Sequence, residues 1–159
     1  MNRRKNQRKG MTDDQIAEVI GAQFKVINEA IRSLVYSRAI RSIGTRMGHF
    51  WVSTNNAHIQ SFITAWSKCF GSKKDDTHWT KSTSNRQDFK RRLQRELDLN
   101  GRSFKNYFKS LLTIRNKVVS HTDLTSSDVF IPNLDQGLDS LRFFHGELRK
   151  ELQNLENLS

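Results

Sequence analysis

The sequence predicts an all-α protein, a single antiparallel bundle of about five helices. Apolar residues recur every three to four positions along most of the chain, which is the period of a helix that buries one face. Strand-like alternation is scarce, and Pro132 is the one proline. A length of 159 residues suits one hydrophobic core, so we expect a helical domain over residues 11–159 after a flexible basic tail at residues 1–10.

Capping signals set the expected ends of the first two helices. Thr12 and Gln15 form a capping box at the start of a helix that continues to about Ile43. A second helix is expected over residues 46–70, where Gly71 is well placed to end it. Cys69 near the end of this helix is expected in the core, because free cysteine is among the most buried residue types.

The polar segment at residues 71–83 is expected to be a loop. We expect Trp79 to fold back onto the core, while the neighbouring His78 could belong to a site or simply form hydrogen bonds. After this loop, Ser84 and Gln87 form a second capping box and predict a short helix over residues 84–97.

Two further helices complete the expected fold. Ser103 is expected to cap a helix that ends at about Ser120, and residues 122–132 are expected to form a loop. Regularly spaced Leu and Phe residues predict the last helix, over residues 134–155. Their spacing approaches a heptad, so this helix should pack lengthwise on the first helix or on a second subunit.

Positive charge is concentrated in the middle of the sequence. The net charge is +11, and residues 68–117 carry 14 Lys and Arg against five acidic residues, whereas the segment at residues 118–159 is acidic. This asymmetry favours a polyanionic partner, although a charged surface can also serve solubility alone.

An arginine interrupts the apolar stripe of the fourth predicted helix. At about 100° per residue, Arg115 falls beside Phe108 and Leu111, at the centre of the stripe. Burial of an unpaired charge there would be costly. Three explanations stay open, namely an ion pair with Glu29 or Asp139, an apolar stem whose head group reaches water, and a seam or cleft that admits an anion.

His121 follows six residues after Arg115, near the expected end of the same helix. The two side chains lie about 120° apart around the helix axis, so their head groups could converge at the helix end or across a two-fold dimer axis. A histidine in this position also has a simpler explanation, because its charged form interacts favourably with the helix dipole.

The stretch RNKVVSH, from Arg115 to His121, resembles the Arg-x5-His motif of the HEPN superfamily, with Asn116 in the polar position. The next three residues, at 122–124, are similar to members from abortive-infection and toxin systems. The resemblance covers residues 115–124 in sequence detail and about 12–158 in architecture. It implies a HEPN-like bundle that acts as a metal-independent endoribonuclease, usually a homodimer in which the motifs of two subunits meet.

The resemblance also assigns roles to three residues. His121 would act as general base or acid on the ribose 2′-hydroxyl and the leaving oxygen, Arg115 would hold the scissile phosphate, and Asn116 would orient these groups. Histidine titrates near neutral pH and guanidinium matches phosphate oxygens, so the chemistry is consistent. The side chains expected to neutralise RNA phosphates are Lys90, Arg91, Arg92, Arg95, Lys105, Lys109 and Lys117, with the basic tail adding nonspecific attraction.

Further expectations concern cofactors, location and alternatives. No carboxylate cluster, HExxH or Cys/His set suggests a metal, and we expect no cofactor. No run of about 18 apolar residues predicts a membrane span, and the single cysteine fits a reducing cytoplasm. The expected function is RNA cleavage by a toxin or anti-phage defence effector, with an antitoxin or other regulatory protein as a candidate partner. The alternatives are a non-catalytic HEPN-like module that binds RNA or a partner, and a scaffold with Arg115 in an ion pair.

Overall fold

The computed structural model describes residues 10–43, 48–120 and 131–157, with the backbone alone at residues 118–120. These ranges contain α1 (Asp13–Ser42), α2 (His49–Phe70), the short 3-10 helix η1 (Trp79–Lys81), α3 (Arg86–Glu96), α4 (Gly101–Ser120) and α5 (Leu134–Glu156). The predicted all-α helical bundle is therefore confirmed. The tail predicted at residues 1–10 lies outside the described residues except for Gly10. In the described part of the chain, no helix is both long and apolar enough to cross a bilayer.

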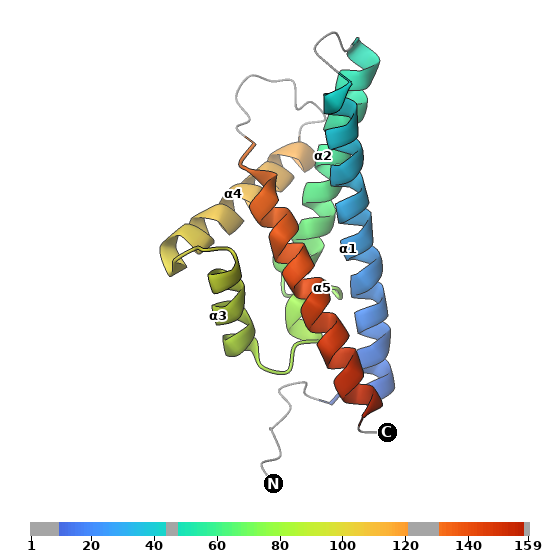
Figure 1. Cartoon of the computed structure of the whole chain (residues 1–159), viewed down its shortest axis with the longest axis vertical. Coiled ribbons are helices and arrows are strands. Elements are labelled where there is room, and N and C mark those ends of the chain that lie inside the picture. Colours follow the sequence, from blue (N-terminus) through green and yellow to red (C-terminus); the bar gives the residue numbers. More distant parts are fainter. Residues whose placement is uncertain (1–9, 44–47, 121–130, 158–159) are drawn as a thin grey trace.

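Three long helices form the body of the bundle (Figure 1). α1 runs antiparallel to α2 and to α5, and the predicted lengthwise packing of the last helix on the first is confirmed. Phe24 of α1 meets His145 of α5 edge to face, with 4.8 Å between the ring centroids. α4 crosses α2 obliquely instead of following the antiparallel order, and α3 packs beside α5.

The hydrophobic core runs between α1 and the C-terminal half of α2 and continues to α4 and α5. Trp66 is fully buried there, and its Nε1–H donates a hydrogen bond of 2.9 Å to Ser140 Oγ on α5. The Trp66 ring also packs edge to face on Phe108 of α4, at 4.9 Å between centroids. Cys69 is buried as predicted, and burial raises the pKa of its thiol to about 12. Other fully buried side chains are Phe62, Phe89, Leu111, Leu141 and Phe144.

The capping box predicted for α1 and the stop predicted for α2 are confirmed. The backbone N–H of Gln15 donates to Thr12 Oγ1 at 3.3 Å, and the N–H of Thr12 donates to Gln15 Oε1 at 2.9 Å. Gly71 caps the C-terminus of α2 and donates its N–H to the carbonyl of Ser67.

The predicted caps were wrong by one residue at α3 and by three residues at α4. Asn85 caps α3 by accepting from the N–H of Asp88 at 3.1 Å, while the hydroxyl of Ser84 instead donates to Glu151 on α5 at 2.8 Å. At α4, Asn100 Oδ1 accepts from the N–H of Ser103 at 2.9 Å, so Ser103 lies inside the first turn. In both places an asparagine immediately before the helix has replaced the expected serine, which agrees with the strong preference for Asn at this position.

At the end of the bundle where α1 ends and α2 begins, hydrogen bonds between small polar side chains join the two helices. Here Ser33 Oγ donates to Ser61 Oγ at 3.1 Å, and Ser37 Oγ donates to Asn55 Oδ1 at 2.8 Å. We call α1 from Val35 to Ile43 and α2 from His49 to His58 the hairpin tip. Small polar side chains therefore join the two helices at the tip and just below it, while most larger apolar side chains of the tip are exposed and Ile40 is buried.

An ion pair ties α3 to α5. The guanidinium of Arg92 lies 2.5 Å from Glu147 Oε2 and 2.7 Å from Asp88 Oδ2, and Lys150 Nζ lies 2.8 Å from Glu147 Oε1. Burial acts to raise the pKa of Glu147, but the hydrogen bonds from Arg92 and Lys150 outweigh it, so that the pKa is lowered. The Glu147 side chain is only 11% exposed, so the pair is expected to stabilise the fold.

Glu147→Gln should lower the free energy of unfolding at pH 7 by about 1–3 kcal/mol, because Arg92 loses a charged partner. A carboxylate with a lowered pKa contributes stability above its ordinary pKa and loses it as the pH falls, so the difference should shrink below about pH 4.5. Urea denaturation at pH 7 and pH 4 measures both effects. Glu18→Gln, at an exposed position of α1, is the control. Equal losses of unfolding free energy in the two variants would contradict the role of the ion pair.

Candidate functional site

The C-terminal half of α4 places Arg115 at the edge of a buried stripe. Phe104, Tyr107, Leu111 and Ile114 are buried, whereas Arg115 is half-buried. The stripe that faces the core is thus turned slightly away from the predicted centre, toward Tyr107 and Ile114. Arg115 consequently lies on its shoulder rather than in its middle.

The guanidinium of Arg115 has a buried nitrogen without a partner. Its Nε is buried and forms no hydrogen bond. Among the residues that the structure describes, none of the ion pairs involves Arg115, which leaves the predicted pairing with Glu29 or Asp139 without support. Glu29 is exposed, and Asp139 lies 3.3 Å from Arg142 on its own helix. A buried N–H without a partner costs about 1–3 kcal/mol, so the position of Arg115 needs another reason.

The other two predicted catalytic residues are Asn116 and His121, and only Asn116 is among the described residues. Asn116 is exposed on α4. His121 follows Ser120, the last residue of α4, and lies outside the described residues. Whether the Arg115 and His121 side chains converge therefore stays a prediction.

The predicted RNA-binding cations divide into two groups. The cations that remain exposed belong to α3 and α4, and they are Lys90, Arg91, Arg95, Lys105, Lys109 and Lys117. Arg92 differs, because it binds two carboxylates and its guanidinium lies 5.7 Å from the Phe143 ring. Its main contacts hold α3 on α5, so it is less available to a phosphate than its neighbours.

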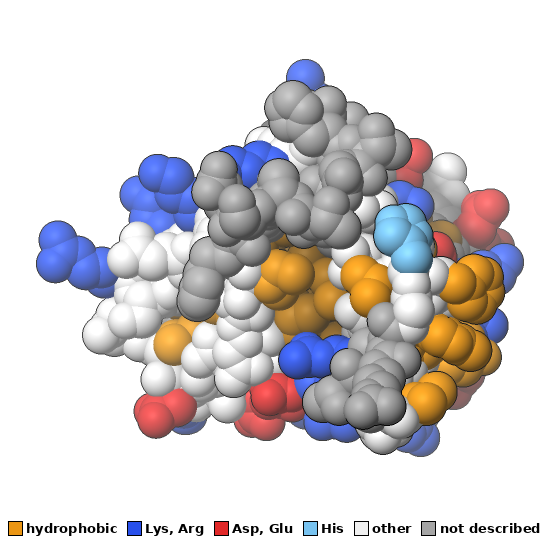
Figure 2. Space-filling model, turned by 90° about the horizontal axis from the view of Figure 1, so that it is seen from above, with side chains coloured by type: hydrophobic (Ala, Val, Ile, Leu, Met, Phe, Trp, Pro, Cys, Tyr) orange, Lys and Arg blue, Asp and Glu red, His pale blue; other side chains and the backbone are white. Residues whose placement is uncertain are grey.

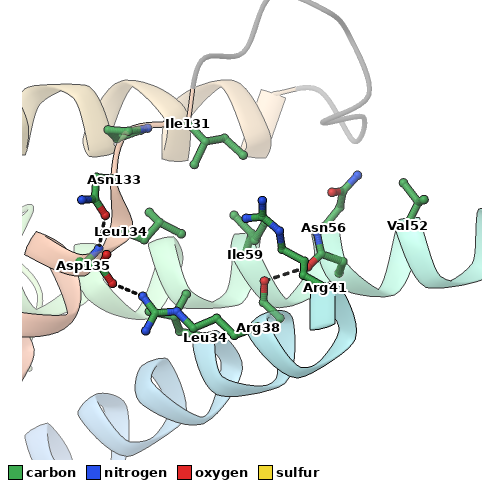
Figure 3. Close-up of a pocket in the computed structure, with 13 residues that line it drawn as sticks. Leu34, Arg38, Arg41, Val52, Asn56, Ile59, Ile131, Asn133, Leu134 and Asp135 are labelled. Carbon is green, nitrogen blue, oxygen red and sulfur yellow. Dashed lines mark hydrogen bonds and ion pairs between the residues drawn. The ribbon is translucent and has the colours of Figure 1, made fainter. Parts of the chain in front are cut away.

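A pocket between α1, α2 and the segment that leads into α5 was not foreseen from the sequence (Figure 3). Its volume is about 980 Å³, and it lies between the hairpin tip and the segment that leads into α5. Arg38 and Arg41 of α1, Asn55 and Asn56 of α2, and Asp135 of α5 supply its charged and amide groups. A sequence signal did exist, because no Asp or Glu occurs between Ala30 and Lys74.

His78 has a structural role in the loop before η1. It is 3% exposed, and its Nδ1 accepts a hydrogen bond of 3.3 Å from the N–H of Thr80. Its carbonyl accepts from Gln23 Nε2 at 3.1 Å, which ties the loop to α1. Trp79 stacks on Phe89 with 4.6 Å between centroids, which confirms that it folds back onto the core. Burial lowers the pKa of His78 to about 4, so the imidazole is neutral at pH 7.

The structure defines a fold class, an all-α bundle with exposed cations on α3 and α4 and with a half-buried arginine in α4. Comparison of the chain with protein-family models, curated proteins and solved structures found no match. Within the described residues, no group of three or more His, Cys, Asp or Glu side chains could hold a metal ion.

Arg115→Met should raise the free energy of unfolding by about 1 kcal/mol, because methionine keeps the apolar contacts and removes the buried N–H without a partner. Chemical denaturation measures the change. Arg92→Met is the matched contrast and should lower the same free energy, since it removes the Arg92 guanidinium from the largely buried Glu147 and leaves only Lys150 as its partner. A loss above about 1 kcal/mol in Arg115→Met would identify Arg115 as a structural residue instead.

His78→Asn should flatten the dependence of stability on pH between about pH 6.5 and 4. In the wild type, the unfolded chain takes up a proton on this histidine before the folded chain does, so stability falls as the pH falls through this range. Asparagine does not titrate, yet its oxygen can still accept from Thr80. Thermal melts over this pH range measure the slope, and the same change at exposed His49 should leave it as in the wild type.

Proposed function

We propose that the chain is a metal-independent endoribonuclease of the HEPN type, a homodimer that acts as a toxin or anti-phage defence effector. The observation that supports this most is the half-buried Arg115, whose Nε has no hydrogen-bond partner and which stands six residues before His121. Among the described residues, this arginine forms no ion pair that would stabilise the fold. A phosphate of the substrate would supply the missing partner.

The proposed reaction uses the ribose of the substrate as its nucleophile. His121 removes the proton of the 2′-hydroxyl, whose oxygen attacks the adjacent phosphorus, and the 5′-oxygen of the next nucleotide leaves and takes up a proton. Negative charge that develops on the phosphate is stabilised by Arg115, while Asn116 orients the reacting groups. The products are a 2′,3′-cyclic phosphate and a free 5′-hydroxyl. In the proposed dimer the two motifs meet, and an antitoxin or another regulatory protein would control access to them.

The exposed cations of α3 and α4 support RNA as the ligand. Lys105 and Lys109 stand four residues apart on α4, so both project from one face of the helix. Lys90, Arg91 and Arg95 extend this charge onto α3. The same cations favour the second candidate function, a non-catalytic HEPN-like module that binds RNA or a partner, because they neutralise phosphates whether or not cleavage follows.

Purified protein should cleave single-stranded RNA in the presence of EDTA and leave 2′,3′-cyclic phosphate ends. His121→Ala should reduce the rate by about 10²- to 10⁴-fold, the usual contribution of a general acid or base. Arg115→Met should cause a comparable loss while keeping the fold. Gel analysis of end-labelled RNA measures the rate, and RNA with a 2′-deoxyribose at the cleavage site should resist.

Arg149→Met, at an exposed position of α5, is the control for the loss of one arginine. The cleavage rate of this variant should equal that of the wild type. Cleavage that survives both His121→Ala and Arg115→Met would overturn the proposed site. RNA binding without any cleavage, over many RNA sequences, would instead favour the non-catalytic module.

A further inference from the structure

The hairpin tip exposes six of its large apolar side chains, whereas Ile40 is buried. Those that remain exposed at the tip are Val35, Tyr36, Ile43, Phe50, Trp51 and Val52, with exposed fractions from 37% to 69%. Between the helices stand the hydrogen-bonded pairs Ser33–Ser61 and Ser37–Asn55. Clustered apolar side chains on a surface commonly mark an interaction site. Seen from this end (Figure 2), a group of hydrophobic side chains lies beside Lys and Arg side chains.

The pocket lies beside this tip and is lined by one face of each helix. Ser37, Arg38 and Arg41 project from α1, and Val52 and Asn56 project from α2 at matching helical spacing. The guanidinium of Arg41 reaches over the pocket near Ile59, and the amide of Asn56 points into it (Figure 3). A volume of about 980 Å³ lies at the upper end of the range for small-ligand sites, enough for a nucleotide unit.

The charge of this region favours an anion. Asp135 is the one carboxylate among the described residues that line the pocket, and it is already paired with Arg38. Arg41 forms no ion pair with a described residue, so the pocket keeps one uncompensated positive charge. The sequence from Ala30 to Lys74, which spans the tip, contains no acidic residue that could repel a phosphate.

An exposed tryptophan stands next to the pocket. Trp51 is 42% exposed, directly precedes the lining residue Val52, and lies one helical turn before Asn55. Its ring meets that of Phe50 edge to face at 5.2 Å between centroids. The other two tryptophans, Trp66 and Trp79, are used by the core. Exposed aromatic rings beside cations are the combination on which the bases of single-stranded nucleic acids stack.

We propose that the pocket and the part of the hairpin tip beside it, around Trp51, form a second binding surface for single-stranded RNA, in which Arg41 contacts a phosphate, Asn56 a base edge and Trp51 stacks on a base. The choice of RNA as the ligand rests on the proposed function, and the surface is separate from the cations of α3 and α4. A lipid surface would favour the apolar side chains but gives no use to the amides that line the pocket. Base edges do use them, because amide groups donate to and accept from nucleobases.

Fluorescence anisotropy with a labelled single-stranded RNA that carries 2′-O-methyl groups throughout measures binding without cleavage. Trp51→Ala should weaken binding by about 5- to 100-fold, the range for loss of one stacked base, whereas Trp51→Phe should retain most of the affinity. Arg41→Ala should weaken binding and reduce the salt dependence by about one counterion.

Two exposed residues of α1 that do not line the pocket serve as matched controls. Tyr36→Ala removes an aromatic ring that packs on His58, and Arg32→Ala removes a cation one helical turn before Tyr36. Both should bind RNA within about twofold of the wild type if the pocket side of the tip is the surface.

Equal affinity of Trp51→Ala, Arg41→Ala and the wild type for this RNA would overturn the surface, even if RNA cleavage is found. Weakened binding in these variants, with no cleavage by the wild type, would uphold the surface and reject the proposed enzyme. Binding to vesicles of phosphatidylcholine and phosphatidylglycerol that depends on Trp51, without dependence in the RNA assay, would assign the tip to a membrane and overturn the proposal. Dissociation of a dimer by Trp51→Ala in sedimentation, with RNA affinity unchanged, would overturn it in favour of a second copy.

Discussion

The arrangement of the helices depends on the burial of one tryptophan. Trp66 can leave water only if its Nε1–H finds a partner, and Ser140 of α5 supplies it at 2.9 Å. The same ring needs neighbours on its other side, and Phe108 of α4 provides an edge-to-face contact. These two requirements bring α4 and α5 onto the C-terminal half of α2. They also explain why α4 crosses α2 obliquely, since its aromatic residues have to reach that point.

Concentrating the core around Trp66 leaves the other end of the α1–α2 pair with few helices to cover it. There the small side chains of Ser33 and Ser37 on α1 need little space and donate hydrogen bonds across the interface to Ser61 and Asn55 on α2. Most of the large apolar residues at the tip are consequently exposed, and Ile40 is the exception. The pocket and the exposed Trp51 thus lie at the tip because the core around Trp66 lies toward the other end of the α1–α2 pair.

The sequence was sufficient for features that depend on local chemistry, and insufficient for those that depend on partners far along the chain. The period of the apolar residues and the Thr12 capping box predicted the helices, because both act within a few residues. The cap at Ser84 failed because Glu151, far away in sequence, takes its hydroxyl. The pocket combines faces of α1, α2 and the start of α5, so no single segment of the sequence predicts it. For His121, the predicted position relative to Arg115 falls outside the described residues.

Two arginines of the basic middle segment illustrate how structure separates stability from function. The guanidinium of Arg92 binds Asp88 and Glu147, and these contacts explain its presence through the packing of α3 on α5. Arg115 occupies a site of similar burial, yet its Nε forms no hydrogen bond. A methionine or leucine would fill the same space at lower cost to the free energy of folding. Because an apolar residue at this position would give a more stable fold, the arginine is best explained by a ligand. The chemistry of guanidinium makes that ligand an anion such as a phosphate.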